Sequence, residues 1–332
     1  RIAIDAVIDS GKICEASICY TGDILDPERS KYDLKYYVKM AKELKAAGTH
    51  ILGVKDMAGL LRPAAAKVLI KAIKDEIDLP IHFHTHDTSG LGGATIIAAA
   101  EAGVDIADAA MDSFSGGTSQ PCLGSIVEAL RNTNRDTRLN REAILEINNY
   151  WNAVRSQYAA FESGIKSPVS EIFLHEMPGG QFTNLKAQAR SMGLEDKWPE
   201  IASTYADVNK MFGDIVKVTP SSKVVGDMAL MMVSQGISRS DIESSSVEVS
   251  FPESVVDMLS GNLGQPPQGF PKNLVKKVLK GKEIKTERPG ANLKEVDIGQ
   301  ERLDLSKQLE GRKVDDEDLF GYLMYPVVFL DY

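Results

Sequence analysis

The chain has 332 residues, of which 43% are hydrophobic and 26% are charged, and its formal net charge at pH 7 is -9. This composition is typical of a globular protein with one large or two medium domains. The acidic balance argues against nucleic acid as a partner, and no apolar run is long enough to span a membrane. The three cysteines, Cys14, Cys19 and Cys122, lack CxxC or zinc-type spacing, so we expect reduced, buried residues of an intracellular protein.

The first residues predict that the chain begins inside a helix. Residues 1–9 have helical spacing and end at the stop signal Ser10-Gly11. Because neither an initiating methionine nor a helix cap precedes them, we expect a longer protein from which this sequence is taken. The lack of a targeting peptide then carries no information.

From residue 12 to about 135, one pattern occurs four times: an apolar strand, a polar turn and an amphipathic helix. Successive units of about 30 residues are typical of βα units in a parallel sheet. The predicted strands lie near residues 13–20, 50–55, 80–86 and 106–111. The predicted helices lie near residues 31–47, 63–77, 90–102 and 119–132.

Polar, ionisable and glycine residues follow each predicted strand, at 21–23, 55–56, 84–87 and 112–117. The carboxyl ends of parallel strands carry the active sites of both (β/α)₈ barrels and open α/β sheets. The absence of a glycine-rich nucleotide-binding motif argues against the open sheet. Since a barrel needs eight units and about 250 residues, we expect half a barrel here, with the missing units preceding Arg1.

The strongest candidate site is a group of histidines. His82, His84 and His86 alternate with other residues in one predicted strand, so they share a face. Neighbouring imidazoles of this kind suit zinc, manganese or iron, although a lone strand histidine is more often a core residue. Lys55 ends the preceding strand at the same edge, where a lysine is commonly only solvated or salt-bridged. We predict a metal or catalytic centre at this edge.

Beyond residue 136 the alternation stops and the chain becomes mostly helical, beginning with a long helix over residues 140–162. We therefore predict two domains, residues 1–137 and 138–332. Within the second, Thr219 followed by Pro220 has the pattern of a helix N-cap with proline at the first helical position. No biotin-type Met-Lys-Met string occurs, so we place any carrier module outside the chain.

Six motifs of the chain, in this order, together resemble the carboxyltransferase domain of biotin-dependent pyruvate carboxylases of bacterial type, and the resemblance covers essentially all residues. They are CYTGD at 19–23, VKDMAG at 54–59, HTHDTSG at 84–90, DSFSGGTSQP at 112–121, EMPGGQ at 176–181 and VTPSS at 218–222.

The resemblance implies an α/β fold: the C-terminal half of a (β/α)₈ TIM barrel, followed by a mostly helical funnel domain. It also implies that Lys55 is N6-carboxylated and binds Mn²⁺ or Zn²⁺ together with His84 and His86. Carboxylation makes physical sense because it turns the amine into an anionic oxygen ligand. His82 lies outside this pattern and keeps its interpretation as a core residue. A fourth ligand, an aspartate, and the residues that hold pyruvate would precede Arg1.

The implied activity is the ligase half-reaction that moves CO₂ from carboxybiotin to the enolate of pyruvate, giving oxaloacetate for anaplerosis and gluconeogenesis. In this resemblance Thr219 relays a proton, a role that outweighs the cap favoured by the local sequence and can coexist with it through different atoms. We expect the chain alone to be inactive, since its site is incomplete. Further polar residues expected at the rim are Asp23, Asp56, Asp87 and Gln181.

The implied partners are pyruvate, a biotin carboxyl carrier domain and a biotin carboxylase domain with ATP. Acetyl-CoA would act as an activator on another domain, and the assembly would be a homotetramer. Neither nucleic acid nor membrane is expected as a partner. The expected location is the bacterial cytoplasm, with a mitochondrial location left open.

Three alternatives stay open. The oxaloacetate decarboxylase alpha chain and the transcarboxylase 5S subunit share the lysine and the histidine pair, but Asp87, where they tend to have serine, favours pyruvate carboxylase. A metal-dependent lyase of the aldolase-like group keeps the histidines without the lysine, so Lys55 argues against it. A non-catalytic assembly or regulatory piece is the third, and deuterium exchange of pyruvate would distinguish it from an enzyme.

Overall fold

The structure is a computed structural model that describes residues 1–162, 164–244 and 247–331. Its contacts divide the chain into two compact units, residues 1–286 and 287–332. The expected domain boundary after residue 137 lies inside the first unit and stays a prediction. Among the described residues, no helix has the length and apolar character needed to cross a membrane.

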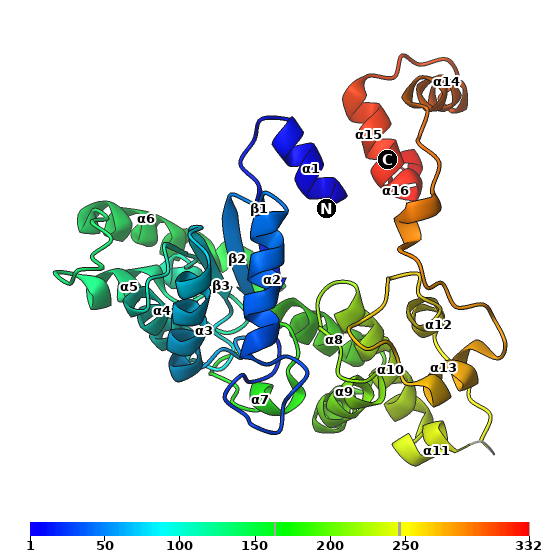
Figure 1. Cartoon of the computed structure of the whole chain (residues 1–332), viewed down its shortest axis with the longest axis horizontal. Helices are drawn as coiled ribbons and strands as arrows, with labels where there is room; N and C mark the ends of the chain where they lie inside the picture. The colour runs from blue at the N-terminus through cyan, green and yellow to red at the C-terminus, as the bar shows by residue number, and fades with distance from the viewer. Residues whose placement is uncertain (163, 245–246, 332) are drawn as a thin grey trace. The chain divides into compact units, whose positions relative to one another are not determined.

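Within the described part of the chain, four parallel strands form one sheet in the order β1-β2-β3-β4 (Figure 1). The strands are β1 (Glu15–Cys19), β2 (Ile51–Asp56), β3 (Ile81–Thr85) and β4 (Ile106–Ala107). The helices that precede, connect and follow them are α1 (Ile2–Asp9), α2 (Leu34–Ala46), α3 (Pro63–Glu76), α4 (Gly92–Glu101) and α5 (Leu123–Leu130). The predicted consecutive parallel strands and βα units are confirmed.

Side-chain alternation explains how the sheet is covered. In β3, Ile81 and Phe83 are completely buried, whereas His82 and His84 on the opposite face are partly exposed. Because successive strand residues point to opposite faces, the apolar face packs under α2, α3 and α4, which lie along one side of the sheet in Figure 1. The histidines therefore lie on the face of the sheet opposite to these helices.

Three predicted elements differ in length from those observed. The fourth strand pairs only over Ile106–Ala107, and Ala110 forms an isolated bridge with Cys122. That bridge keeps the residues around Cys122 extended, so α5 begins at Leu123 instead of near residue 119. The helix predicted over 140–162 is α6 (Arg141–Val154), which continues only as a 3₁₀ turn, η2 (Arg155–Phe161).

The rest of the first unit is helical. It contains α7 (Ile172–His175), α8 (Gly179–Ser191), α9 (Trp198–Met211), α10 (Ser221–Gln235), α11 (Arg239–Glu243), α12 (Glu253–Leu259) and α13 (Lys272–Leu279), with 3₁₀ turns η1 (Asp112–Phe114) and η3 (Glu195–Lys197). The second unit contains η4 (Pro289–Asn292), α14 (Ile298–Gln308), α15 (Asp316–Met324) and α16 (Pro326–Asp331). A small core of Leu305, Val314 and Leu319 belongs to this unit.

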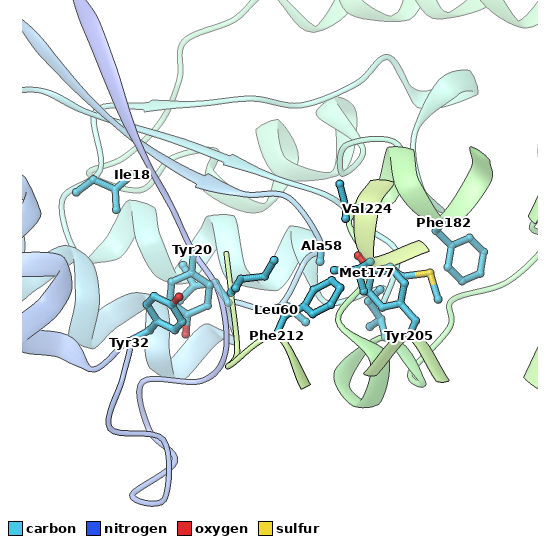
Figure 2. Packing of buried hydrophobic residues seen from close by; sticks show 14 of the residues in the cluster. Ile18, Tyr20, Tyr32, Ala58, Leu60, Met177, Phe182, Tyr205, Phe212 and Val224 are labelled. Carbon is cyan, nitrogen blue, oxygen red and sulfur yellow. The ribbon is translucent and has the colours of Figure 1, made fainter. Parts of the chain in front are cut away.

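One hydrophobic core joins the sheet to the helical part of the first unit. It includes Ala58 and Leu60 of the loop that follows β2, together with Met177, Tyr205 and Phe212 of the helical part (Figure 2). Each of these side chains is at most 4% exposed. The helical part therefore packs firmly on the edge of the sheet where the strands end, which is the edge predicted to hold the site.

Buried His175, at the end of α7, makes the stability of this region sensitive to acid. Its Nδ1 accepts a hydrogen bond from the Met177 amide at 3.1 Å, and its Nε2 is buried without a partner among the described residues. Burial lowers the pKa of His175 from 6.5 to about 4. The folded state thus requires the neutral ring, so the stability it contributes is complete above pH 6.5 and is lost as the pH falls toward 4.

We expect the free energy of unfolding to fall by about 2 kcal/mol between pH 7 and pH 5 because of this single residue. The His175→Asn variant keeps an acceptor for the Met177 amide but cannot titrate, so its unfolding free energy should lose this pH dependence. Urea denaturation at both pH values measures it. His50→Asn, at an exposed histidine that likewise accepts a backbone hydrogen bond, is the matched control. If the unfolding free energy of His175→Asn changes with pH as much as that of the unmutated chain, His175 is not the residue responsible.

Candidate functional site

The predicted ligands Lys55, His84 and His86 come together at the carboxyl edge of the sheet. Lys55 of β2 is the register partner of His84 of β3, so their side chains leave adjacent strands on the same face. His86 follows His84 on that face, and their ring centroids are 5.2 Å apart at an interplanar angle of 80°. On the other side of Lys55, Cys19 of β1 is its register partner.

Hydrogen bonds orient both imidazoles in the way that metal-binding histidines require. The Nδ1 atom of His84 lies 2.7 Å from a carboxylate oxygen of Asp108, and Nδ1 of His86 lies 2.6 Å from the carbonyl oxygen of Thr118. Since a carbonyl only accepts, Nδ1 of His86 carries the proton, and the carboxylate selects the same tautomer for His84. Each ring is left with an unprotonated Nε2, the atom that can bind a metal.

Sequence reasoning missed Asp108 and Thr118. Thr118 lies inside one of the six motifs, but it contributes only a backbone oxygen, which no residue type can reveal. Asp108 follows the short strand β4 directly, so the strand-end rule applied to the observed boundary would have found it. Because the predicted strand extended to residue 111, Asp108 lay inside it and not at its end.

The electrostatics of the site favour a neutral imidazole at His86 and a charged carboxylate at Asp108. Burial lowers the pKa of His86, the nearby charge of Lys55 acts in the same direction, and the hydrogen bond to the Thr118 carbonyl opposes both. Burial opposes ionisation of Asp108, yet the hydrogen bond from His84 and the adjacent His82 ring lower its pKa overall. The edge of the sheet therefore carries imidazole nitrogens with lone pairs that can bind a cation. The Asp108 carboxylate supports one of these rings through a hydrogen bond.

His82 is not the core residue that was expected. Its side chain is 20% exposed, with Nδ1 2.9 Å from a carboxylate oxygen of Glu15 and Nε2 2.9 Å from the Oδ1 of Asp108. Burial opposes its charge, but these two carboxylates raise the pKa of His82 overall. In the described structure, contacts with the carboxylates of Glu15 and Asp108 take the place of apolar packing around this ring.

The EMPGGQ motif lies directly over His86. A Cβ atom on Gly179, the first residue of α8, would lie 2.7 Å from Nδ1 of His86 and 3.0 Å from the Thr118 carbonyl oxygen. Only glycine fits that contact. The Gly179 amide donates to the carbonyl of Met57 at 2.8 Å, which ties α8 to the loop that follows β2. The helical part thus packs against His86 at this contact.

Two of the four expected rim residues hold local backbone structure. Asp56 is completely buried on the face opposite Lys55, and its carboxylate accepts 2.9 Å hydrogen bonds from the Leu60 and Leu61 amides and the Thr85 hydroxyl. Burial raises its pKa against the effect of these bonds. The Asp87 carboxylate accepts from the Gly92 amide at 2.9 Å, and burial raises its pKa as well.

The other two lie in different surroundings. Asp23 forms an ion pair with Arg62 at 2.8 Å. Gln181 is 8% exposed, on α8 where it crosses α10 closely at Gly226. Roles in ligand binding for all four rim residues stay predictions.

The prediction that Thr219 caps a helix is wrong. Helix α10 begins at Ser221 with Pro220 as its N-cap residue, and no side chain completes the cap. The Ser221 hydroxyl organises this turn instead, accepting from the Val218 amide at 3.1 Å. Thr219 is exposed, and its hydroxyl has no hydrogen-bond partner within the described ranges. The hydroxyl is therefore available for another role.

His, Cys, Asp and Glu side chains do not by themselves form a metal site in the described part of the chain, because no three of them are arranged to hold an ion. Lys55, adjacent to His84, is placed to supply the missing ligand if its amine is carboxylated, because the carbamate provides oxygen atoms. The geometry and the two free Nε2 atoms fit such a site.

Asp108 should control metal affinity through His84. We expect Asp108→Ala to weaken binding of Mn²⁺ or Zn²⁺ by about 10–100-fold, because the His84 ring loses the partner that fixes its tautomer. Equilibrium dialysis with metal analysis measures the change. Glu15→Gln is the control, since Glu15 contacts His82 and not His84. Equal affinities for Asp108→Ala and Glu15→Gln would exclude this role.

Comparison with known proteins matches two families to the chain: one described as "HMGL-like" over residues 23–150 and one described as "Conserved carboxylase domain" over residues 172–332. Pyruvate carboxylase of Bacillus subtilis is 52% identical over 331 residues, covering 100% of this chain and 29% of that protein. The solved carboxyltransferase domain of Rhizobium etli pyruvate carboxylase is 64% identical, with a TM-score of 0.97, covering 99% of this chain and 55% of that one. This chain matches the carboxyltransferase region of pyruvate carboxylases.

The match extends to eukaryotic relatives and settles the fold class. Human mitochondrial pyruvate carboxylase is 47% identical over 334 residues, covering 99% of this chain and 28% of that protein. The chain therefore spans less than a third of these curated relatives. The agreement with the carboxyltransferase domain confirms the expected α/β architecture of barrel type followed by a mostly helical part.

Proposed function

We propose that this chain forms the part of a pyruvate carboxylase that transfers CO₂ from carboxybiotin to the enolate of pyruvate, giving oxaloacetate. The observation that carries the proposal is the group of Lys55, His84 and His86 at one edge of the sheet, with both Nε2 atoms free. The match over the whole chain to a solved carboxyltransferase domain supports it.

The metal site would consist of carboxylated Lys55, His84 and His86, with Mn²⁺ or Zn²⁺ bound. When bound, the metal supplies a Lewis acid that polarises a substrate oxygen. The contribution of this chain is orientation: Asp108 and the Thr118 carbonyl fix the two rings, and Gly179 lets the helical part pack against His86.

The reaction requires a proton to move between the two substrates. The methyl carbon of pyruvate loses a proton and forms a bond to the carboxyl carbon. The bond between that carbon and the ureido nitrogen of biotin breaks, and the nitrogen gains a proton. A hydroxyl that donates to one partner and accepts from the other balances both changes. Thr219 has an exposed hydroxyl that makes no competing hydrogen bond in the described structure, so we assign it this role.

The remaining components belong to the proposal as well. They are biotin on a carrier domain, a biotin carboxylase domain with ATP, acetyl-CoA as an activator, a homotetramer and a cytoplasmic location. Structures of Rhizobium etli pyruvate carboxylase have been solved with pyruvate and biocytin and with the allosteric activator acetyl coenzyme-A, which supports the first and third of these.

Exchange of the methyl hydrogens of pyruvate with deuterium from the solvent tests the proposal in the full-length protein. We expect exchange that requires biotin and the metal, together with ATP-dependent formation of oxaloacetate. A full-length protein that carboxylates biotin but neither exchanges nor carboxylates pyruvate would overturn the proposal.

A further inference from the structure

A buried ion network lies next to the loop that leads to Thr219. Lys217 is 2% exposed, and its ammonium lies 3.0 Å from the Oε2 of Glu176 and 3.4 Å from the hydroxyl of Thr21. The other carboxylate oxygen of Glu176 lies 2.5 Å from the guanidinium of Arg29. A buried lysine that the proposed reaction does not use therefore sits two residues before the proposed proton relay.

This network joins three segments that are far apart in the sequence. Thr21 and Arg29 belong to the loop that follows β1, the strand that pairs with the strand of Lys55. Glu176 ends α7 in the left-handed conformation, at φ 54°, inside the EMPGGQ motif. Lys217 belongs to the segment between α9 and α10. The ion pairs thus fasten the loop of Thr219 to the edge of the sheet that carries the histidines.

Packing alone does not call for a charge at residue 217. Burying an ion pair costs desolvation energy, and a well-packed apolar side chain of similar volume is often as stable or more stable. The ion pair contributes geometric specificity. A charged hydrogen bond fixes the distance and angle between the two segments that it joins. Glu176 keeps its second partner, Arg29, when Lys217 is removed.

The start of the same segment is held independently. The Lys31 ammonium donates to the carbonyl oxygens of Gly213 and Asp214 at 2.6 and 2.9 Å, and the Tyr32 hydroxyl donates to the same Asp214 carbonyl at 2.9 Å. The Thr219 side chain has no bond of its own in the described structure. Its position therefore depends on the backbone, which Lys217 ties to Glu176 and to Thr21 in the loop after β1.

We propose that Lys217, through its ion pair with Glu176, is a positioning residue that sets the Thr219 hydroxyl for proton transfer. The inference rests on the proposed function. A misplacement of the hydroxyl by about 1 Å costs on the order of 100-fold in rate, so loss of the pair should be measurable in the chemical step.

The test is Lys217→Met in the full-length protein. We expect kcat for pyruvate carboxylation to fall by about 10–100-fold, with the KM for pyruvate changed by less than about threefold. ATP-dependent carboxylation of biotin should be unchanged. The solvent deuterium isotope effect on kcat should rise, because proton transfer becomes slower than the other steps. Lys210→Met, at an exposed lysine of α9 that pairs with Asp207 at 4.0 Å, is the matched control.

A double-mutant cycle separates this inference from the proposed function. If Lys217 acts through Thr219, adding Lys217→Met to Thr219→Ala should cause no further loss of kcat. If the fold-losses in kcat of the two single variants multiply in the double variant, the inference is overturned. If Thr219→Ala itself is fully active, the proposed function of Thr219 fails instead.

A purely structural role makes a different prediction, namely a lower melting temperature with unchanged kcat and isotope effect, and that result would also overturn the inference. Should Lys217→Met not fold, the Glu176→Gln, Lys217→Met double variant serves the same comparisons. It removes both buried charges and leaves only Arg29, which is 37% exposed.

Discussion

Replacing Thr219 by alanine in the full-length protein is expected to lower pyruvate carboxylation by about 10²–10⁴-fold, the usual contribution of a positioned proton-transfer group. The structure supports a chemical role, because the hydroxyl is exposed and makes no hydrogen bond within the described residues. The other half-reaction, ATP-dependent carboxylation of biotin, should proceed at its normal rate. Separate assays of oxaloacetate and of ADP formation measure the two steps.

The Thr219→Ser variant should keep appreciable activity, since serine retains the hydroxyl. Thr286→Ala, at another exposed threonine, is the control and should change neither rate. If Thr219→Ala forms oxaloacetate at the normal rate and melts at a lower temperature, Thr219 contributes to stability and not to the reaction. An equal loss in Thr219→Ser and Thr219→Ala would contradict the proton-relay role, because the hydroxyl would then not be the active group.

Replacing Lys55 by glutamine is expected to remove tightly bound metal and to abolish carboxylation of pyruvate. Lys55 is the partner of His84 in the strand register and the candidate for the missing ligand. Glutamine has nearly the same reach but cannot form a carbamate, so the site loses one of the three ligands that this chain is proposed to supply. We expect the affinity for Mn²⁺ or Zn²⁺ to fall by at least about 100-fold, more than the loss of an outer hydrogen-bond partner causes.

Dependence on CO₂ makes this test specific. A carbamate forms only from dissolved CO₂, so the metal affinity of the unmutated protein should rise with bicarbonate concentration, and that of Lys55→Gln should not. Lys45→Gln, at an exposed lysine that pairs with Asp78 at 2.6 Å, is the control and should bind metal as the unmutated protein does. Metal affinity that is independent of bicarbonate in the unmutated protein would exclude carboxylysine as a ligand.

Much of the site follows from periodicity and order along the chain. The period of two in β3 places His84 and His86 on one face, and the parallel βα units bring Lys55 to the same edge, so both features are visible without coordinates. The motif order identified the family, and comparison with solved carboxyltransferase domains confirmed it. These properties depend on local geometry, which is why a sequence can reveal them.

Other properties depend on contacts between distant residues, and only the tertiary structure decided them. The Thr118 carbonyl that orients His86, the Asp108 carboxylate behind His84 and the buried Lys217–Glu176 pair each join segments separated by 24 or more residues. The cap predicted at Thr219 failed because Ser221, not Thr219, makes the local hydrogen bonds of that turn. The sequence by itself determined which residues carry the chemistry, since strand period and motif order are local. The tertiary structure alone decided which partners orient them, because hydrogen bonds and ion pairs depend on how the loops pack against one another.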